Sequence, residues 1–201
     1  MSIWAIVPVK PFLRSKSRLS GVLSPQERAG LSRDFLGHAL DVLAKVSGVT
    51  QTLVVSRDPA ALALAHSRQV RTVTESGAPD LNTALRRATQ VAVASRAQGV
   101  LILPTDLPFL TPEDVGQLIT THGDGRQVAI APDRHDDGTN ALFTAPPELF
   151  GYAFGEHSFG KHLELARAAG ARVRVCRLPG VALDVDGPED LRLFLAARKP
   201  E

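Results

Sequence analysis

A series of short apolar runs rich in β-branched residues, separated by stretches with helical signals, constrains the fold of this chain most strongly. In three of the gaps Ser24, Asp58 and Thr111 each stand directly before a proline, a pattern that opens helices. Strands that alternate with helices predict an α/β fold built on a mostly parallel central sheet flanked by helices. The runs are Ile3 to Val9, Thr52 to Ser56, Val70 to Val73, Gly99 to Leu103, Val128 to Ala131, Ala141 to Phe143 and Arg172 to Leu178.

Length and composition favour one domain over residues 1–201. The apolar share of 44% is ordinary for a globular domain, and no apolar stretch reaches the roughly 18 to 20 residues of a membrane span. The formal charge is only +2 and the arginines are spread along the chain, which argues against nucleic acid as a partner. The one cysteine, Cys176, excludes an internal disulfide and fits a reducing compartment, the cytoplasm.

Three aspartates in two short segments are the leading candidates for chemistry. Asp106 lies in LPTDLPFL, just past an apolar run. Asp184 and Asp186 lie in LDVDGPEDL, where a strand over Val181 to Leu183 would point both carboxylates to one side. Such carboxylates, together with substrate phosphates, suit Mg²⁺. The alternative is that Asp106 and Asp186 cap the helices that follow them.

The segment after the first expected strand, VPVKPFLRSKSRLSGVL, is rich in cations. Lys10, Arg14, Lys16 and Arg18 would stand at the carboxyl end of that strand, where α/β sheets gather ligands. Lysines can act there as point charges and arginines as bidentate clamps on a polyphosphate. The alternative is a solvated basic loop. The segment has neither GxxxxGK[ST] nor GxGxxG, so it is neither a P-loop nor a dinucleotide fingerprint.

Two further segments are suited to an anionic ligand: APDRHDDGTNAL at 131–142 and FGEHSFGKHLELA at 154–166. In the second, Gly155 allows close backbone approach, Ser158 offers a hydroxyl, and a following helix would present free amides. We expect Lys161 and His162 to add positive charge. In the first, Thr139 and Asn140 taken alone are better explained as turn residues after Asp137-Gly138.

Taken together and in order, PVK followed by KSRL, LPTDLPFL, DGTNAL, GEHSFGKH and LDVDGPEDL resemble the CofC/FbiD family of guanylyltransferases of coenzyme F-420 biosynthesis. The resemblance runs from about Ile3 to Leu195. It implies a single-domain, GT-A-like, Rossmann-related nucleotidyltransferase fold. It also implies transfer of GMP from GTP to a small phosphorylated three-carbon acid with release of pyrophosphate.

The resemblance assigns roles to most of the candidate residues. Asp106, Asp184 and Asp186 would hold Mg²⁺ and, with Lys16, form the catalytic set. Lys16, supported by Lys10 and Arg14, would bind the phosphates of GTP. Thr139, Gly155 and Ser158 would grip the acid, and Asn82 and Glu75 would lie near the base and ribose. Taken alone, Asn82 is more simply explained as a residue at a helix start.

Several alternatives remain open at this stage. Phosphoenolpyruvate is favoured as the acid over 2-phospho-L-lactate, and 3-phosphoglycerate is a third candidate. A GT-A glycosyltransferase, another sugar- or cofactor-type nucleotidyltransferase and a non-catalytic nucleotide-binding module are the competing functions. The family would also suit handover of its product to the next enzyme of the pathway. The alternating strand from Arg172 to Leu178 would suit pairing in a homodimer, or would be an ordinary charged edge.

Overall fold

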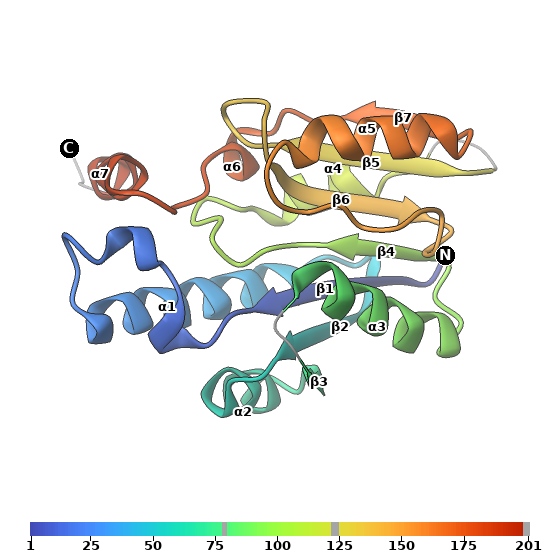
Figure 1. Cartoon of the computed structure of the whole chain (residues 1–201). Helices are drawn as coiled ribbons and strands as arrows, with labels where there is room; N and C mark the ends of the chain where they lie inside the picture. Colours follow the sequence, from blue (N-terminus) through green and yellow to red (C-terminus); the bar gives the residue numbers. More distant parts are fainter. Residues whose placement is uncertain (78–79, 122–124, 199–201) are drawn as a thin grey trace.

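The computed structural model describes residues 1–77, 80–121 and 125–198. Within these residues one mixed sheet runs in the order β3-β2-β1-β4-β6-β5-β7 (Figure 1). Only β6 runs antiparallel to its neighbours, β4 and β5, so the expectation of a mostly parallel sheet is confirmed. The strands are β1 (Ile3–Val9), β2 (Val49–Ser56), β3 (Arg71–Thr74), β4 (Gly99–Ile102), β5 (Gln127–Pro132), β6 (Thr139–Ala145) and β7 (Arg172–Val175).

Helices cover both faces of the sheet. The α helices are α1 (Pro25–Leu43), α2 (Pro59–Ser67), α3 (Leu81–Ala94), α4 (Pro112–Ile119), α5 (Ser158–Ala168), α6 (Pro179–Ala182) and α7 (Pro188–Ala197). One apolar core joins α1, α2 and α4 to the sheet and includes Cys176, and a second joins α3 and α5 to the opposite face. In Figure 1, α3 and α5 lie in front of the sheet.

Local chemistry explains where the main helices begin. The Ser24 side chain accepts from the backbone N–H of Glu27 while Glu27 accepts from the N–H of Ser24, a capping box that starts α1. Thr111 and Asp114 form the same reciprocal pair at α4. Asp58 caps α2 through the N–H of Ala60. The proline that follows each cap is preorganised for the first helical turn.

The expected strand over Val181 to Leu183 is wrong. Val181 and Ala182 belong to α6, which begins at Pro179, and Leu183 is its extended C-cap, followed by Asp184. Proline fixes a helical φ and lacks an N–H, so it suits the first turn of a helix better than a strand within a sheet. Val181 is fully buried in the core as a helical residue. Its apolar character is therefore equally compatible with a buried strand and with a buried helix.

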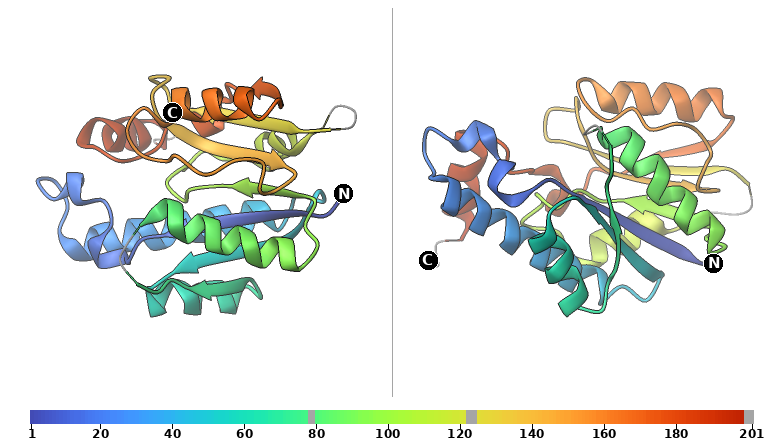
Figure 2. Two further views of the ribbon diagram at one scale, coloured as in Figure 1. Left: turned by 45° about the vertical axis from the view of Figure 1, so that its right-hand side comes forward. Right: turned by 60° about the horizontal axis from the view of Figure 1, so that its bottom comes forward.

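The carboxyl ends of β1 and β4 point to the left in Figure 1, where α6, α7 and the segment between β1 and α1 meet. That segment contains two 3₁₀ turns, η1 (Phe12–Arg14) and η2 (Ser17–Leu19). A third apolar cluster, formed by Leu19, Phe35, Val185, Leu191 and Phe194, packs the segment, α1 and α7 together. Figure 2 shows α7, in red, beside the blue N-terminal part in both views. The segment between β1 and α1 and the C-terminal helix α7 thus lie together beside these strand ends.

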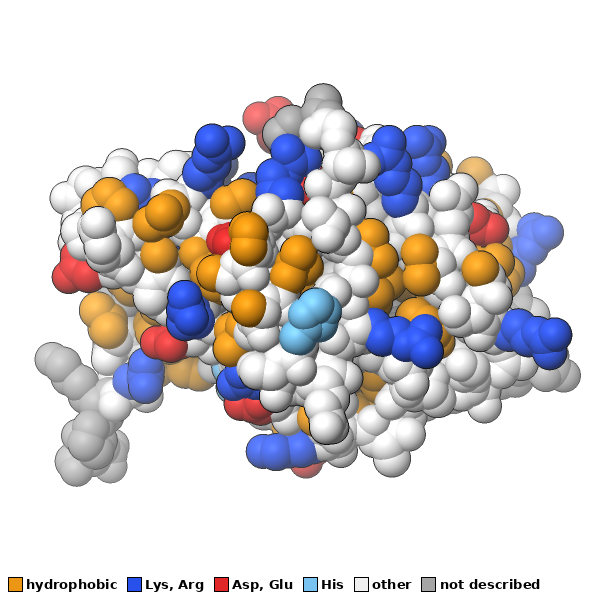
Figure 3. Space-filling model, turned by 90° about the horizontal axis from the view of Figure 1, so that it is seen from below, with side chains coloured by type: hydrophobic (Ala, Val, Ile, Leu, Met, Phe, Trp, Pro, Cys, Tyr) orange, Lys and Arg blue, Asp and Glu red, His pale blue; other side chains and the backbone are white. Residues whose placement is uncertain are grey.

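Among the helices of the described residues, none has both the length and the apolar character that a membrane span requires. Figure 3 views the molecule from the side of α2 and β3. Basic and hydrophobic side chains are scattered over this face and do not join into one tract.

Candidate active site

Lys16 lies between two of the predicted aspartates. Its Nζ is 2.7 Å from Oδ2 of Asp106 and 3.2 Å from Oδ1 of Asp186, although the three residues come from distant parts of the sequence. Only 7% of the Lys16 side chain is exposed. The guanidinium of Arg18 also reaches Asp186, at 3.4 Å, but from a side chain that is 78% exposed. The structure therefore brings Lys16, Asp106 and Asp186 together at the strand ends.

The backbone and the charge of Lys16 are both unusual. Lys16 adopts φ 53° and ψ 39°, a left-handed conformation that side chains other than glycine rarely take outside constrained sites. Burial by itself would lower its pKa, but attraction to Asp106 and Asp186 and hydrogen bonds to both outweigh this effect, so the pKa is raised. Lys16 is consequently a fixed positive charge at neutral pH and not a candidate for a general base.

Asp184 belongs to the same acidic site, because the charges of Asp106 and Asp186 both act on its carboxylate. The amide nitrogen of buried Asn140 lies 3.4 Å from Oδ1 of Asp184 and donates to the carbonyl of Val181 at 2.8 Å. The pKa of Asp184 is raised, first by burial and then by the charge of Asp106, with a smaller effect from Asp186. Asp184 is thus a carboxylate in a place that favours a nearby cation.

Backbone contacts hold the acidic segments in register. The N–H of Val185 donates to the carbonyl of Asp106 at 3.0 Å, tying the two segments directly. The carboxylate of Asp190 accepts from the N–H groups of Asp186 and Gly187, at 3.1 and 2.6 Å. Arg134 in turn lies 2.9 Å from Asp190. Neither Asp106 nor Asp186 is the N-cap of a helix, since Thr111 caps α4 and Gly187 stands before α7.

The segment after β1 is anchored at its start and carries the other predicted cations. The Ser56 hydroxyl donates to the carbonyl of Val9 at 2.8 Å, and Asp58 accepts from the N–H of Phe12 at 2.7 Å. Lys10 and Arg14 are exposed beyond these anchors. They lie on the same segment as Lys16 and can be reached by a ligand from solvent.

The residues predicted to grip the acid lie around the start of β6 and α5. Thr139 begins β6, which pairs with β4 through Leu142 and Ile102, so Thr139 stands near the end of β4 and the aspartates. Ser158 is the first residue of α5 and is 2% exposed. Gly155 has φ +128°, a conformation that residues with a side chain rarely adopt, and open space surrounds the position of a Cβ. Thr139 and α5 are joined through His162.

The expectation that His162 adds positive charge is wrong. His162 is completely buried, and burial lowers its pKa to about 4. Its ring lies against Phe154, with the ring centroids 4.8 Å apart. The helical spacing in GKHLELA turns this side chain inward, so a histidine in a polar motif is a neutral part of the core.

Asn82 and Glu75 have firm protein partners. The Asn82 side chain donates to the carbonyl of Phe154 at 3.1 Å and accepts from its N–H at 2.9 Å. Asp80 supplies the cap of α3, so Asn82 is not the residue that starts the helix. Glu75 is paired with Arg57, whose Nη2 lies 2.9 Å from its carboxylate. The contacts that both residues were predicted to make with the nucleotide stay predictions.

The described residues contain no group of three histidine, cysteine or acidic side chains arranged to hold a metal ion. The cation between Asp106 and Asp186 is the Lys16 ammonium. The donor chemistry nevertheless fits Mg²⁺, which often takes only one or two carboxylates and completes its shell with substrate phosphates and water. The raised pKa of Asp184, caused by burial and neighbouring carboxylates, points the same way.

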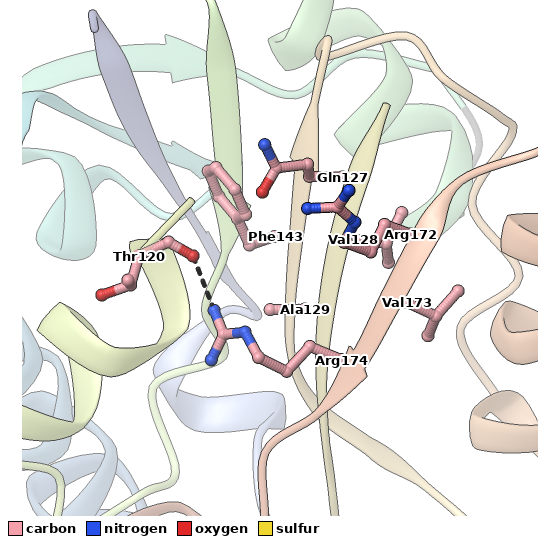
Figure 4. Close-up of a pocket in the computed structure, with 8 residues that line it drawn as sticks. All are labelled: Thr120, Gln127, Val128, Ala129, Phe143, Arg172, Val173 and Arg174. Carbon is pink, nitrogen blue, oxygen red and sulfur yellow. Dashed lines mark hydrogen bonds between the residues drawn. The ribbon is translucent and has the colours of Figure 1, made fainter. Parts of the chain in front are cut away.

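A cavity of about 190 Å³ lies at the other end of the sheet (Figure 4). It is lined by residues at the starts of β5 and β7, and Arg174 crosses it to donate to the carbonyl of Thr120 at 2.8 Å. Ligands of parallel sheets gather at the carboxyl ends of strands, so this cavity is not the candidate active site.

Comparison with known proteins identifies the family. The sequence profile described as "Guanylyl transferase CofC like" matches residues 3–197. The chain belongs to this family. It is 43% identical over 191 residues to a phosphoenolpyruvate guanylyltransferase of Rubrobacter xylanophilus, covering 95% of this chain and 92% of the relative. It is 37% identical over 191 residues to a 2-phospho-L-lactate guanylyltransferase of Methanothermobacter thermautotrophicus, covering 95% and 83%. The family resemblance inferred from the motifs is confirmed.

The fold of this CofC-like chain is also found in solved structures. It matches a nucleotidyl transferase of Methanothermobacter thermautotrophicus with a TM-score of 0.68 at 16% identity, covering 98% of this chain and 99% of the other. At that identity the likeness shows the fold alone. It confirms the expected nucleotidyltransferase fold.

Sequence reasoning about this CofC-like chain did not find the roles of three residues that organise the site. Asn140 orients Asp184, Asp190 holds the backbone at Asp186, and His162 links Thr139 to α5. All three lie within motifs that the sequence analysis had already singled out. Their own signal was a polar residue beside an apolar run, which becomes informative only once the long-range partner is known.

Proposed function

We propose that this chain transfers GMP from GTP to phosphoenolpyruvate or 2-phospho-L-lactate, with release of pyrophosphate, in the cytoplasmic biosynthesis of coenzyme F-420. The observation that carries the proposal is the buried Lys16 between Asp106 and Asp186, at the carboxyl ends of the strands of a chain that belongs to the CofC-like family. A site of carboxylates and a fixed cation is suited to phosphoryl chemistry.

The reaction needs no nucleophile from the protein. A phosphate oxygen of the acid attacks the α-phosphorus of GTP and forms a new P–O bond. The bond from the α-phosphorus to the bridging oxygen of the β-phosphate breaks, and pyrophosphate leaves with that oxygen. The product carries the acid and guanosine on a shared diphosphate. The work of the protein is to position two anionic reactants and to neutralise their charge.

Asp106, Asp184 and Asp186 would hold Mg²⁺ in this reaction. When bound, the ion would supply charge neutralisation for the triphosphate and for the pyrophosphate that leaves. The permanent charge of Lys16, maintained by its raised pKa, would bind the phosphates directly. Asn140 would keep the Asp184 carboxylate oriented through the 3.4 Å contact with its amide.

The remaining predicted residues divide between the two substrates. Exposed Lys10 and Arg14 would meet the phosphates of GTP as it enters. Asn82 and Glu75 would contact the base and ribose, with Glu75 oriented by its ion pair with Arg57. Backbone amides around Gly155 and Ser158, together with the Thr139 hydroxyl, would bind the acid.

Phosphoenolpyruvate is the favoured acid. The 43% identical relative is a phosphoenolpyruvate guanylyltransferase, and the 37% identical relative is a 2-phospho-L-lactate guanylyltransferase. The higher identity favours phosphoenolpyruvate as the acid. The two acids differ by two hydrogens across one carbon–carbon bond, a difference small enough for pocket shape to decide.

The proposal is tested by alanine replacement of the aspartates. Asp106→Ala and Asp184→Ala should each abolish pyrophosphate release from GTP and acid while the circular dichroism spectrum stays native. Asp41→Ala is a suitable control, because Asp41 is an exposed residue that pairs with Arg68 at 2.9 Å away from the site and should leave turnover unchanged. Full turnover in either site variant would overturn the metal assignment.

A further inference from the structure

His162 links three elements at the acid-binding side of the site. Its Nδ1 lies 2.9 Å from the Thr139 hydroxyl at the start of β6. Its Nε2 lies 3.0 Å from the backbone nitrogen of Ala153, in the segment that leads to Gly155. The residue itself belongs to α5 and has no exposed surface. Both ring nitrogens are therefore occupied by defined partners.

These partners determine where the ring proton lies. A backbone N–H can only donate, so Nε2 of His162 must be the acceptor of the Ala153 bond. A neutral imidazole with an accepting Nε2 carries its proton on Nδ1. Nδ1–H then donates to the Thr139 oxygen, which leaves the Thr139 hydroxyl proton directed at a different acceptor. Burial, which keeps the ring neutral, supports the same assignment.

We propose that His162 is a positioning residue for binding of the acid substrate. His162 holds the Thr139 hydroxyl as a hydrogen-bond donor aimed at an anionic oxygen of that substrate. The inference rests on the proposed function. Thr139 is largely buried at the start of β6 and directly precedes Asn140, whose amide contacts Asp184. An ionised carboxylate has only acceptors to offer, and a hydroxyl fixed as a donor matches it.

The same histidine keeps the other acid-binding groups in place. Its bond to Ala153 steadies the segment before Gly155, and Asn82 grips the next residue, Phe154, through both backbone groups. The aromatic ring of Phe154 also packs against the imidazole. Movement of His162 would thus disturb Thr139 and the segment of Gly155 together.

The first test compares two replacements of nearly equal size. In His162→Asn the amide nitrogen can take the place of Nδ1 and still donate to Thr139, whereas His162→Leu offers no donor. His162→Leu should raise the KM for the acid by about tenfold or more, the effect of losing one hydrogen bond to a charged group. The KM for GTP should stay unchanged, and His162→Asn should recover most of the lost affinity for the acid. Equal KM values for the acid in the two folded variants would overturn the inference.

A matched pair at the partner residue gives a second comparison. Thr139→Ser keeps the hydroxyl and Thr139→Val removes it at constant shape. Thr139→Val should weaken binding of the acid as His162→Leu does, and the double variant should be no worse than either single one. Additive losses would mean that the two side chains act independently, contrary to the proposal.

The tautomer of His162 can be measured without turnover. Two-dimensional ¹⁵N NMR of the unliganded wild-type protein should show a protonated Nδ1 and an unprotonated Nε2 for this residue. A proton on Nε2, or on both nitrogens at neutral pH, would overturn the inference even if the enzyme is active. Absence of pyrophosphate release by the wild-type protein would instead overturn the proposed function, so the two failures are distinguishable.

Discussion

Replacement of Lys16 by methionine removes the positive charge and keeps a side chain of similar length. This substitution should destabilise the protein. The Lys16 side chain is 7% exposed, and its ammonium is the cation shared by Asp106 and Asp186. Without it, these carboxylates and nearby Asp184 repel one another in a partly buried place. The loss should be largest in a chelator, where no divalent ion can compensate.

The size of the effect follows from the two distances. At an effective dielectric constant of about 20, unit charges 2.7 and 3.2 Å apart attract by about 6 and 5 kcal/mol. Removal of the ammonium from water offsets most of this gain, and Asp186 is screened because 44% of its side chain is exposed. We expect a net loss of about 3 kcal/mol, or about 6 to 12 °C in Tm for a chain of this size.

Urea unfolding in a chelator, followed by circular dichroism, measures this loss. Arg18→Met is the matched control, because Arg18 contacts the same Asp186 at 3.4 Å from a side chain that is 78% exposed. Its effect should stay below about 1 kcal/mol. Added Mg²⁺ should restore more stability to Lys16→Met than to the wild type. Equal stability of Lys16→Met and Arg18→Met would refute the reasoning that the buried ammonium holds the acidic site together.

Three further predictions concern the supports of the site. The pKa of His162 falls from 6.5 to about 4 on folding, so only the unfolded chain binds its proton between these values and stability declines as pH drops through that window. Between pH 7 and pH 4 the wild type should lose about 3 kcal/mol more than His162→Asn in urea unfolding, and parallel losses would contradict the assigned pKa. Asp190→Ala removes the acceptor for the N–H groups of Asp186 and Gly187 and should cost about 1 kcal/mol in thermal melts, with a larger loss in turnover; normal turnover would mean that Asp186 needs no such support. Asn82→Leu should lower stability by about 1 to 3 kcal/mol through the two lost bonds to Phe154, and unchanged unfolding would show that these bonds contribute nothing net.

The fold could be predicted largely because its signals are local. The starts of two helices are indicated by capping pairs within four residues of sequence, Ser24 with Glu27 and Thr111 with Asp114. The buried strands are predicted by apolar runs rich in β-branched residues, such as Ile3 to Val9. The prediction of a strand around Val181 was wrong because an apolar run of that length fits a buried strand or a buried helical turn equally well.

The sequence predicted which residues form the site better than it predicted how these residues contact one another. Motif order placed Lys16, Asp106 and Asp186 in one site, and the structure joins them by ion pairs. Sequence could not indicate that Lys16 would itself lie between the two carboxylates. Nor could it indicate that His162 would be buried and neutral, because its environment is supplied by Thr139 and Phe154 from other elements.

The most direct test of the proposed reaction is the identity of its product. Purified protein would be incubated with GTP, Mg²⁺ and phosphoenolpyruvate, 2-phospho-L-lactate or 3-phosphoglycerate, and the products would be identified by mass spectrometry alongside released pyrophosphate. We predict, with phosphoenolpyruvate or 2-phospho-L-lactate, a product in which GMP and the acid share a diphosphate, formed in equal amount to pyrophosphate and lost on addition of a chelator. GDP with inorganic phosphate, or no product from folded protein that still binds GTP, would contradict the account.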